Sequence, residues 1–302
     1  MNVLIISDIP DISRVRILEC FSSEWKIHIA SPGEEGRYLP EAEVIIPEHV
    51  LVDDAFLHAC PKLKMIQTGA GYDNVDLNAC RENGVIVCNA AGVNASSVAE
   101  HTMALILSWY KNIAILDAGM KYSALPASYS GAEMSDLTIG IIGLGAVGRN
   151  VAKLCRAFDM TVTSFSRHAE NSVDLDTLLR NSDIVSLHVP LTAETRNLIG
   201  RNEFAKMKNS ALLVNTSRGG VVNEDDLCNA LESGMIAGAC LDVFEQEPLP
   251  ALSPLRQMTN VLLTPHTAGY PDGPKYHRKR YLFFADNIQR FADLLEPKNR
   301  IV

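Results

Sequence analysis

A strand, a glycine-rich turn and a helix follow one another between Leu137 and Met160, and no other stretch constrains the fold as strongly. The short apolar run from Ile139 to Ile142 is typical of a buried parallel strand. The sequence Gly-Leu-Gly-Ala-Val-Gly follows at 143–148, and apolar residues then recur at helical spacing. A second strand is expected at Thr161–Phe165. This order predicts a βαβ unit of a parallel sheet.

The three glycines of this turn have separate expected roles. Gly143 permits a tight turn, Gly145 lets a pyrophosphate approach the backbone, and Gly148 lets the helix pack close to the strand. Backbone N–H groups at the helix start, including those of Ala146 and Val147, would face the phosphates. We therefore expect a dinucleotide site, and a βαβ turn that binds no ligand is the alternative.

The residues after the second strand bear on the choice of dinucleotide. Ser166, Arg167 and His168 stand about twenty residues past the first glycine, where a carboxylate binds the ribose 2′-hydroxyl of NAD. A carboxylate would repel a 2′-phosphate, whereas serine, arginine and histidine would attract one. The sequence therefore predicts NADP(H) in preference to NAD(H).

Composition excludes several kinds of partner. The chain has 27 Lys and Arg against 36 Asp and Glu, and a net charge of −9 disfavours nucleic acid. The basic cluster Lys275–Arg280 is interpreted as a solvated helix face.

The seven cysteines are scattered without metal spacing, which favours a reducing cytosol and no metal site. No apolar run reaches the roughly 20 residues that cross a bilayer, so we expect a cytoplasmic protein without membrane contact.

The 302 residues suit two domains. Strands expected before position 93 alternate with helical stretches, which predicts a first parallel sheet. They are Asn2–Ser7, Lys26–Ala30, Val44–Ile46, Lys64–Thr68 and Val85–Cys88. The following loop Gly69-Ala70-Gly71 leaves backbone N–H groups exposed and could hold a small carboxylate. A tight turn without a ligand is the alternative.

In the second half, four further strands each lead into polar residues. They are expected at Ile184–Leu187, Ala211–Asn215, Ala237–Leu241 and Val261–Thr264. Ligands of parallel sheets bind outside the carboxyl ends of the strands, so we expect Arg218, Asp242 and His266 to converge on one crevice.

The residue types in this crevice predict a reaction. Arg218 offers a planar fork for a carboxylate and its adjacent carbonyl. His266 can donate a proton near neutral pH, and Glu247 could orient the imidazole and stabilise its charged form. Taken singly, these could be an ion-paired arginine, a buried histidine and a solvated acid. Together with a dinucleotide they predict hydride transfer to a 2-keto acid.

A long apolar stretch separates the two expected sheets. The helix region 97–116 is apolar on nearly all sides and needs burial on more than one of them. Ser97 and Glu100 have the spacing of a capping box. We interpret this helix as a hinge and part of a subunit interface. A catalytic role for Glu100 or His101 is a less favoured alternative.

The chain resembles the D-isomer-specific 2-hydroxyacid dehydrogenases over nearly its whole length. The resemblance is carried by positions 69–74, 215–219, 241–248 and 264–269. It implies that Arg218, Glu247 and His266 are catalytic, and that the substrate binds Gly69, Ala70, Gly71, Arg218 and His266. The implied cofactor contacts are Gly143, Gly145, Ala146, Val147, Gly148, Ser166, Arg167, His168, His188, Pro190, Thr195, Thr216, Ser217, Arg218, Asp242 and His266. Asp242 would contact the nicotinamide carboxamide.

The resemblance also implies an α/β fold of two Rossmann-like or flavodoxin-like parallel-sheet domains. The dinucleotide-binding domain, 94–269, would be inserted into a substrate domain of 1–93 and 270–302, with a C-terminal helix from about Tyr270 onward. A homodimer would form through the 97–116 helix region.

The implied activity is that of an NAD(P)-dependent oxidoreductase acting on a small 2-keto or 2-hydroxy acid. The chain is similar to glyoxylate/hydroxypyruvate reductases or glycerate dehydrogenases, so glyoxylate or hydroxypyruvate is favoured. Phosphoglycerate-type members carry an arginine where this chain has Pro47-Glu48-His49, which disfavours a phosphorylated substrate. The alternatives are an NADP(H)-sensing, corepressor-like protein without turnover, and a nucleoside-cofactor methyltransferase.

Overall fold

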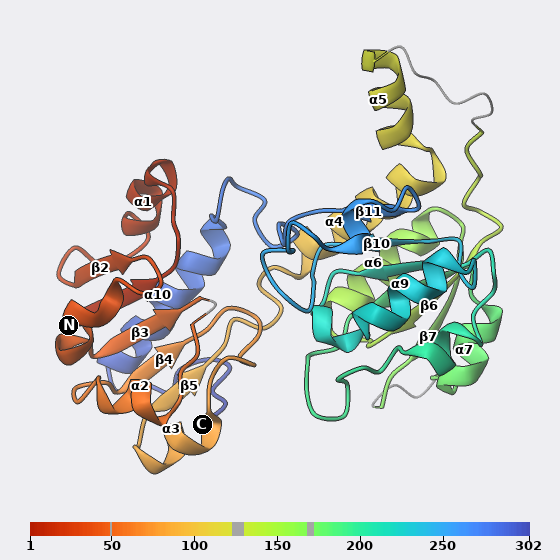
Figure 1. The fold of residues 1–302 in the computed structure, drawn as a ribbon. Coiled ribbons are helices and arrows are strands. Elements are labelled where there is room, and N and C mark those ends of the chain that lie inside the picture. The colour runs from red at the N-terminus through yellow and green to blue at the C-terminus, as the bar shows by residue number, and fades with distance from the viewer. Residues whose placement is uncertain (49, 123–129, 168–171) are drawn as a thin grey trace. The chain divides into compact units, whose positions relative to one another are not determined.

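The computed structural model describes residues 1–48, 50–122, 130–167 and 172–302. The chain forms two compact units, unit 1 with residues 1–94 and 269–302, and unit 2 with residues 95–268. Each unit contains its own parallel sheet with helices packed on it (Figure 1). This confirms the expected α/β fold of two parallel-sheet domains with one inserted into the other. Within the described ranges, no helix is long and apolar enough to span a bilayer.

The sheet of unit 1 has the strand order β2-β1-β3-β4-β5, and every pair is parallel. The strands are β1 (Asn2–Ile6), β2 (Lys26–Ala30), β3 (Val44–Pro47), β4 (Met65–Gln67) and β5 (Ile86–Cys88). The helices are α1 (Asp11–Leu18), α2 (Asp54–His58), α3 (Leu77–Glu82) and α10 (Arg278–Ala292), with 3-10 turns at Glu35–Arg37 and Leu39–Glu41. The strand order reverses direction between β1 and β3, and such a reversal is where open parallel sheets bind ligands.

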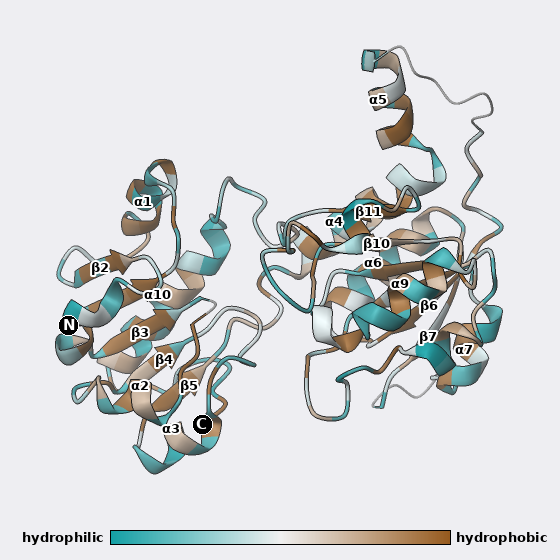
Figure 2. Cartoon of the chain, in the orientation of Figure 1, coloured by the Kyte–Doolittle hydropathy of each residue, from teal (hydrophilic) through white to brown (hydrophobic). Residues whose placement is uncertain are grey.

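Apolar residues fill both faces of this sheet, and Figure 2 shows them concentrated along its strands. In β1, Val3 and Ile5 pack in one buried cluster, whereas Leu4 and Ile6 pack in another. This alternation follows from the two-residue period of a strand. Because both faces are covered, the strands are continuous apolar runs, which is why they could be located from the sequence.

The sheet of unit 2 has the order β11-β10-β9-β8-β6-β7, again with parallel pairs only. The strands are β6 (Thr138–Ile142), β7 (Thr161–Phe165), β8 (Ile184–Leu187), β9 (Leu212–Asn215), β10 (Gly238–Leu241) and β11 (Val261–Leu263). The α-helices are α4 (Ala95–Tyr110), α5 (Ile113–Tyr122), α6 (Ala146–Ala157), α7 (Leu175–Asn181), α8 (Arg201–Phe204) and α9 (Glu224–Glu232). Short 3-10 turns lie at Gly219–Val221 and Pro254–Arg256. The reversal in this sheet falls between β6 and β8.

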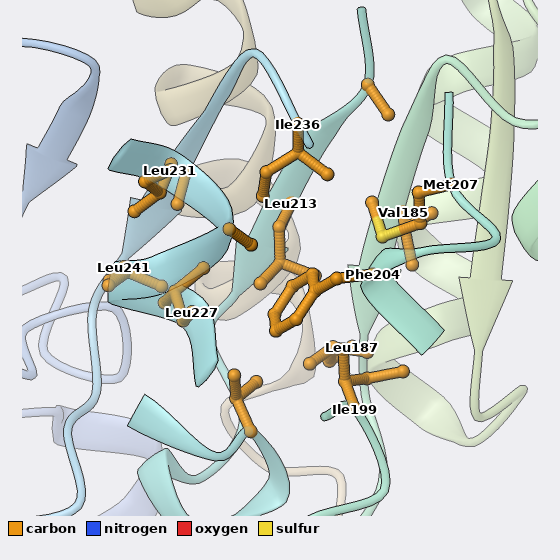
Figure 3. Close-up of a cluster of buried hydrophobic side chains, with 14 of the residues drawn as sticks. Val185, Leu187, Ile199, Phe204, Met207, Leu213, Leu227, Leu231, Ile236 and Leu241 are labelled. Atoms are coloured by element: carbon orange, nitrogen blue, oxygen red, sulfur yellow. The ribbon is translucent and has the colours of Figure 1, made fainter. Parts of the chain in front are cut away.

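Two buried clusters also cover the faces of this second sheet. Helices α4 and α6 pack on one face through residues such as Ile106 and Val151. Helices α7, α8 and α9 cover the other face, where Phe204 lies among Leu187, Ile199 and Leu213 (Figure 3).

The structure differs in two respects from the single helix predicted over 97–116. Helix α4 ends at Tyr110, because Asn112 adopts a left-handed conformation with φ 53°, and α5 begins after it. Ser97 lies inside α4, which begins at Ala95, and its hydroxyl donates to the Ala268 carbonyl at 2.6 Å. The predicted capping box at Ser97 is therefore wrong.

The C-terminal helix begins at Arg278 rather than near Tyr270. The intervening segment contains Gly273 with φ 141° and Lys275 with φ 53°, and neither conformation is helical. The interpretation of Lys275–Arg280 as a solvated face is also wrong for Arg280, whose exposure is only 7%. Consecutive residues of a helix point in directions about 100° apart, and Arg280 falls on the side of α10 that is buried with Tyr281 and Phe284.

Phe204 is fully buried in the core of unit 2, which leads to a test of the fold. Phe204→Ala should lower the free energy of unfolding by about 3 to 5 kcal/mol, because it leaves a cavity in a packed core. Phe158→Ala is the matched control, since Phe158 is 42% exposed. Denaturant titration of both variants measures the difference; equal losses would contradict the packing described here.

Candidate active site

The glycine-rich turn after β6 has the geometry that a dinucleotide requires. Gly143 has φ 97°, and a Cβ there would lie 2.5 Å from the His188 carbonyl oxygen. A Cβ on Gly148 would lie 2.1 Å from the Gly143 carbonyl oxygen, so this helix position must be glycine. Gly145 caps α6, and nothing lies within 4 Å of where its Cβ would be. Open space at the amino end of α6, next to Ala146 and Val147, fits a pyrophosphate.

The loop after β7 carries the residues expected to select the cofactor. Ser166 is half-buried, and its N–H donates to the Ser172 hydroxyl at 2.7 Å. Arg167 is exposed. His168 lies outside the described residues. Within the described residues, Ser166 and Arg167 directly follow β7, and neither is acidic.

After β8 the chain carries His188, Pro190 and Thr195. The His188 ring bonds the Ser186 hydroxyl at 2.9 Å, and burial lowers the pKa of His188 to about 4. His188 is therefore neutral near pH 7. The Thr195 hydroxyl donates to the Pro190 carbonyl at 2.6 Å and fixes this loop.

The loop after β9 is held by the amide of Asn215. The Asn215 amide oxygen accepts from the backbone N–H and the hydroxyl of Ser217, at 3.0 and 2.8 Å. The Asn215 side-chain NH₂ group donates to the Arg218 carbonyl at 2.9 Å. The next residue, Gly219, passes so close to Phe244 that a Cβ would lie 1.8 Å from its carbonyl carbon. The backbone on both sides of Arg218 is thus fixed, and the guanidinium is half-buried. Thr216 is buried and bonds Thr102 of α4 at 2.9 Å.

His266 and Glu247 form a hydrogen-bonded pair in unit 2. Nδ1 of His266 lies 2.6 Å from Oε2 of Glu247, and the two side chains are 32% and 26% exposed. The other Glu247 oxygen accepts from the Phe244 N–H at 3.1 Å, so the carboxylate is fixed. His266 has φ 52°, and its N–H donates to the Asp242 carbonyl at 2.8 Å. This arrangement fixes the imidazole ring through Nδ1 and leaves the second ring nitrogen, Nε2, as the one that could take part in proton transfer.

Asp242 is fully buried and organises the segment that carries His266. One carboxylate oxygen accepts from the Thr264 hydroxyl at 2.6 Å and the Thr267 N–H at 3.0 Å. The other accepts from the Ala268 N–H at 3.0 Å. His101 of α4 completes the network, with its ring nitrogen 3.0 Å from the Thr264 hydroxyl and 3.5 Å from Asp242. From the sequence, a catalytic role for His101 is the less favoured alternative, because most such residues at a helix start are structural. Its contact with Thr264, 163 positions away, is not visible in the sequence pattern.

In unit 1, the loop Gly69–Gly71 turns its carbonyl groups toward the neighbouring strand. The Gly69 carbonyl accepts from the Ala90 N–H at 2.8 Å, and the Ala70 carbonyl accepts from the Asn89 side chain at 3.1 Å. The N–H groups of Ala70 and Gly71 belong to the same two peptides and therefore point away from Ala90 and Asn89. Neither N–H donates a hydrogen bond to the described part of the chain. Two such donors can hold a carboxylate.

A metal is not needed to explain these side chains. Within the described ranges, no group of three or more His, Cys, Asp or Glu residues could hold a metal ion. All seven cysteines are unpaired.

Comparisons with known proteins bear on the family of this chain. Residues 103–268 match the family described as D-isomer specific 2-hydroxyacid dehydrogenase, NAD binding domain. The glyoxylate/hydroxypyruvate reductase B of Escherichia coli is 34% identical and covers 98% of this chain and 95% of its own. The D-3-phosphoglycerate dehydrogenase of Archaeoglobus fulgidus is 39% identical over 77% of this chain but 46% of its own, so the chain spans about half its length.

Solved structures show the same architecture. The TT0316 protein from Thermus thermophilus has a TM-score of 0.89 and 31% identity, with complete coverage of both chains. The acyclic imino acid reductase Bsp5, solved with NADPH and D-Arg, has a TM-score of 0.85 and 28% identity, again with complete coverage. From the matched domain and the full-length relatives, the chain belongs to the D-isomer specific 2-hydroxyacid dehydrogenases, a family of oxidoreductases.

Proposed function

We propose that the protein is an NADP(H)-preferring D-2-hydroxyacid dehydrogenase that reduces a small 2-keto acid, with glyoxylate and hydroxypyruvate favoured. The observation that carries the proposal is the fixed pair of His266 and Glu247, 2.6 Å apart. The Escherichia coli relative, named for both of these substrates, supports their choice.

The dinucleotide would lie along the glycine-rich turn, with its pyrophosphate on Gly145 and the first N–H groups of α6. Bound there, it supplies the hydride. Ser166 and Arg167 favour NADP(H), since neither repels a 2′-phosphate. Solved neighbours of similar fold hold NADPH or NAD, so the proposal rests on these two residues.

The protein's own residues would handle the proton and the charge. His266, with Nδ1 held by Glu247, would give the proton on Nε2 to the carbonyl oxygen as C2 is reduced. Arg218 would bind the substrate carboxylate and carbonyl and stabilise the negative charge that develops. Glu247 would hold the His266 ring in the orientation that this proton transfer needs. The Ala70 and Gly71 N–H groups are proposed as further donors for a substrate carboxylate.

The first test follows NADPH absorbance with glyoxylate, hydroxypyruvate, pyruvate and 2-ketobutyrate. We expect oxidation with at least one of them, and a loss of about a hundredfold or more in kcat for His266→Gln. His58→Gln is the matched control, because His58 is exposed on α2. Turnover of none of the four acids, or undiminished turnover by His266→Gln, would contradict the proposed reaction.

Cofactor choice gives a second prediction. Ser166→Asp places a negative charge where the 2′-phosphate would bind, so kcat/KM with NADPH should fall by about tenfold or more. The same variant should keep or improve its use of NADH, whose ribose carries a free hydroxyl. Ser166→Ala controls for loss of the hydroxyl alone. The NADP(H) assignment fails if wild-type enzyme prefers NADH by the same measurement.

We also propose that the protein forms a homodimer through the segment containing α4 and α5. Helix α5 carries apolar side chains that are largely exposed, including Ile113 at 55% and Met120 at 71% (Figure 2). These residues are seven positions apart and share one face of the helix. Exposed apolar side chains on one helix face favour an interface with another chain.

Light scattering tests the assembly. Wild-type protein should have twice the 33.0 kDa mass of one chain, and the double variant Ile113→Glu, Met120→Glu should have the mass of one. Ile12→Glu is the control, because Ile12 on α1 is 74% exposed outside this segment. A monomeric wild type would rule out the dimer.

A further inference from the structure

A buried ion pair lies where the sheet of unit 1 reverses its strand order. Ser7 directly follows β1 and Glu48 directly follows β3, and the Ser7 hydroxyl donates to Glu48 Oε2 at 2.7 Å. The other Glu48 oxygen pairs with the guanidinium of Arg280, from the first turn of α10. Ligands of open parallel sheets bind at this point, outside the carboxyl ends of the strands.

The guanidinium of Arg280 is almost completely enclosed. Its side chain is 9% exposed, and its Cζ lies 5.1 Å from the centre of the Tyr270 ring and 5.4 Å from those of Tyr281 and Phe284. Nε is buried and has no hydrogen-bond partner in the described part of the chain. A buried donor without a partner costs free energy, and a buried ion pair seldom increases stability over an apolar core. The ion pair with Glu48 therefore leaves part of the guanidinium, Nε, without a partner in the described part of the chain.

The third guanidinium nitrogen, Nη1, lies beside the glycine loop. It is 3.9 Å from the position that a Cβ would take on Gly69. The Gly69–Gly71 loop follows β4, adjacent to β3 in the sheet, and the N–H groups of Ala70 and Gly71 make no bond to the described chain. The charged guanidinium of Arg280 and the neutral N–H groups of Ala70 and Gly71 therefore lie at the same edge of the sheet of unit 1.

We infer that Arg280 is a substrate-binding residue that holds the carboxylate of the 2-keto acid together with the N–H groups of Ala70 and Gly71. The inference rests on the proposed function for the identity of the ligand. Glu48 fixes the guanidinium and offsets its charge, so the site suits one carboxylate rather than a doubly charged phosphate. The segment after β3 has Glu48 where phosphoglycerate-type members of the family carry an arginine. In this chain the basic side chain at that edge of the sheet is Arg280, which comes from α10.

The test measures binding of oxamate, an unreactive analogue of a 2-keto acid, by calorimetry in the presence of NADPH. Arg280→Gln should weaken oxamate binding by about tenfold to a hundredfold, the effect of losing a charge-assisted hydrogen bond. The Kd of NADPH should remain within about twofold. Arg278→Gln is the matched control, because Arg278 lies in the same helical turn and is exposed.

A second variant separates binding from packing. Arg280→Gln leaves Glu48 buried without its cation, so Glu48→Gln, Arg280→Gln removes both charges and keeps a pair that can hydrogen-bond. If Arg280 contacts the ligand, the double variant binds oxamate as weakly as Arg280→Gln. Recovery of wild-type affinity by the double variant would show a packing role only and overturn the inference.

The remaining outcomes distinguish this inference from the proposed reaction. Wild-type protein that binds oxamate through Arg280 but reduces no 2-keto acid would support the inference and contradict the reaction. Normal turnover with equal oxamate affinity in wild type and Arg280→Gln would overturn the inference alone. Failure of wild-type protein to bind oxamate would also overturn it.

Discussion

The burial of both faces of two parallel sheets is the constraint on which the rest of this molecule depends. The interior residues of strands such as β1 and β9 are apolar on both faces of the sheet, and polar residues of these two strands stand only at their ends. Polar side chains can reach water only where a strand ends. Ser7, Glu48, Asp242 and His266 all follow the carboxyl end of a strand within a few residues. The fold itself thus concentrates the chemistry at one edge of each sheet.

Asp242 shows how a buried charge can organise such an edge. A carboxylate inside a protein must be neutralised or fully hydrogen-bonded, and Asp242 receives donors from Thr264, Thr267 and Ala268, with His101 nearby. These bonds fix the backbone on both sides of His266. His266, the proton donor proposed for catalysis, is therefore positioned by the hydrogen bonds of Asp242. Loss of these bonds would leave the Asp242 carboxylate buried without partners, so the segment around His266 is rigid.

The sequence predicted what depends on short-range pattern. Apolar runs located the strands to within one or two residues. The spacing of the glycines predicted a tight turn at Gly143, an open position at Gly145 and a close helix–strand contact at Gly148. It failed where long-range packing decides. Arg280 stands among cations that face water, and its burial depends on Glu48, 232 positions away in the chain. The break at Asn112 was missed because apolar residues continue on both sides of it.

The catalytic and cofactor-selecting features differ in how freely their residues can change. Gly148 and Gly219 pack against backbone at distances that no Cβ can occupy, so substitution would require movement of the main chain. Ser166 and Arg167 stand in a loop beyond β7, where a different side chain needs no repacking of the sheet. A charge change there would alter the attraction that we propose for a 2′-phosphate and would leave the His266–Glu247 pair untouched. Cofactor preference can therefore vary among proteins of this fold while the geometry proposed for proton transfer stays the same.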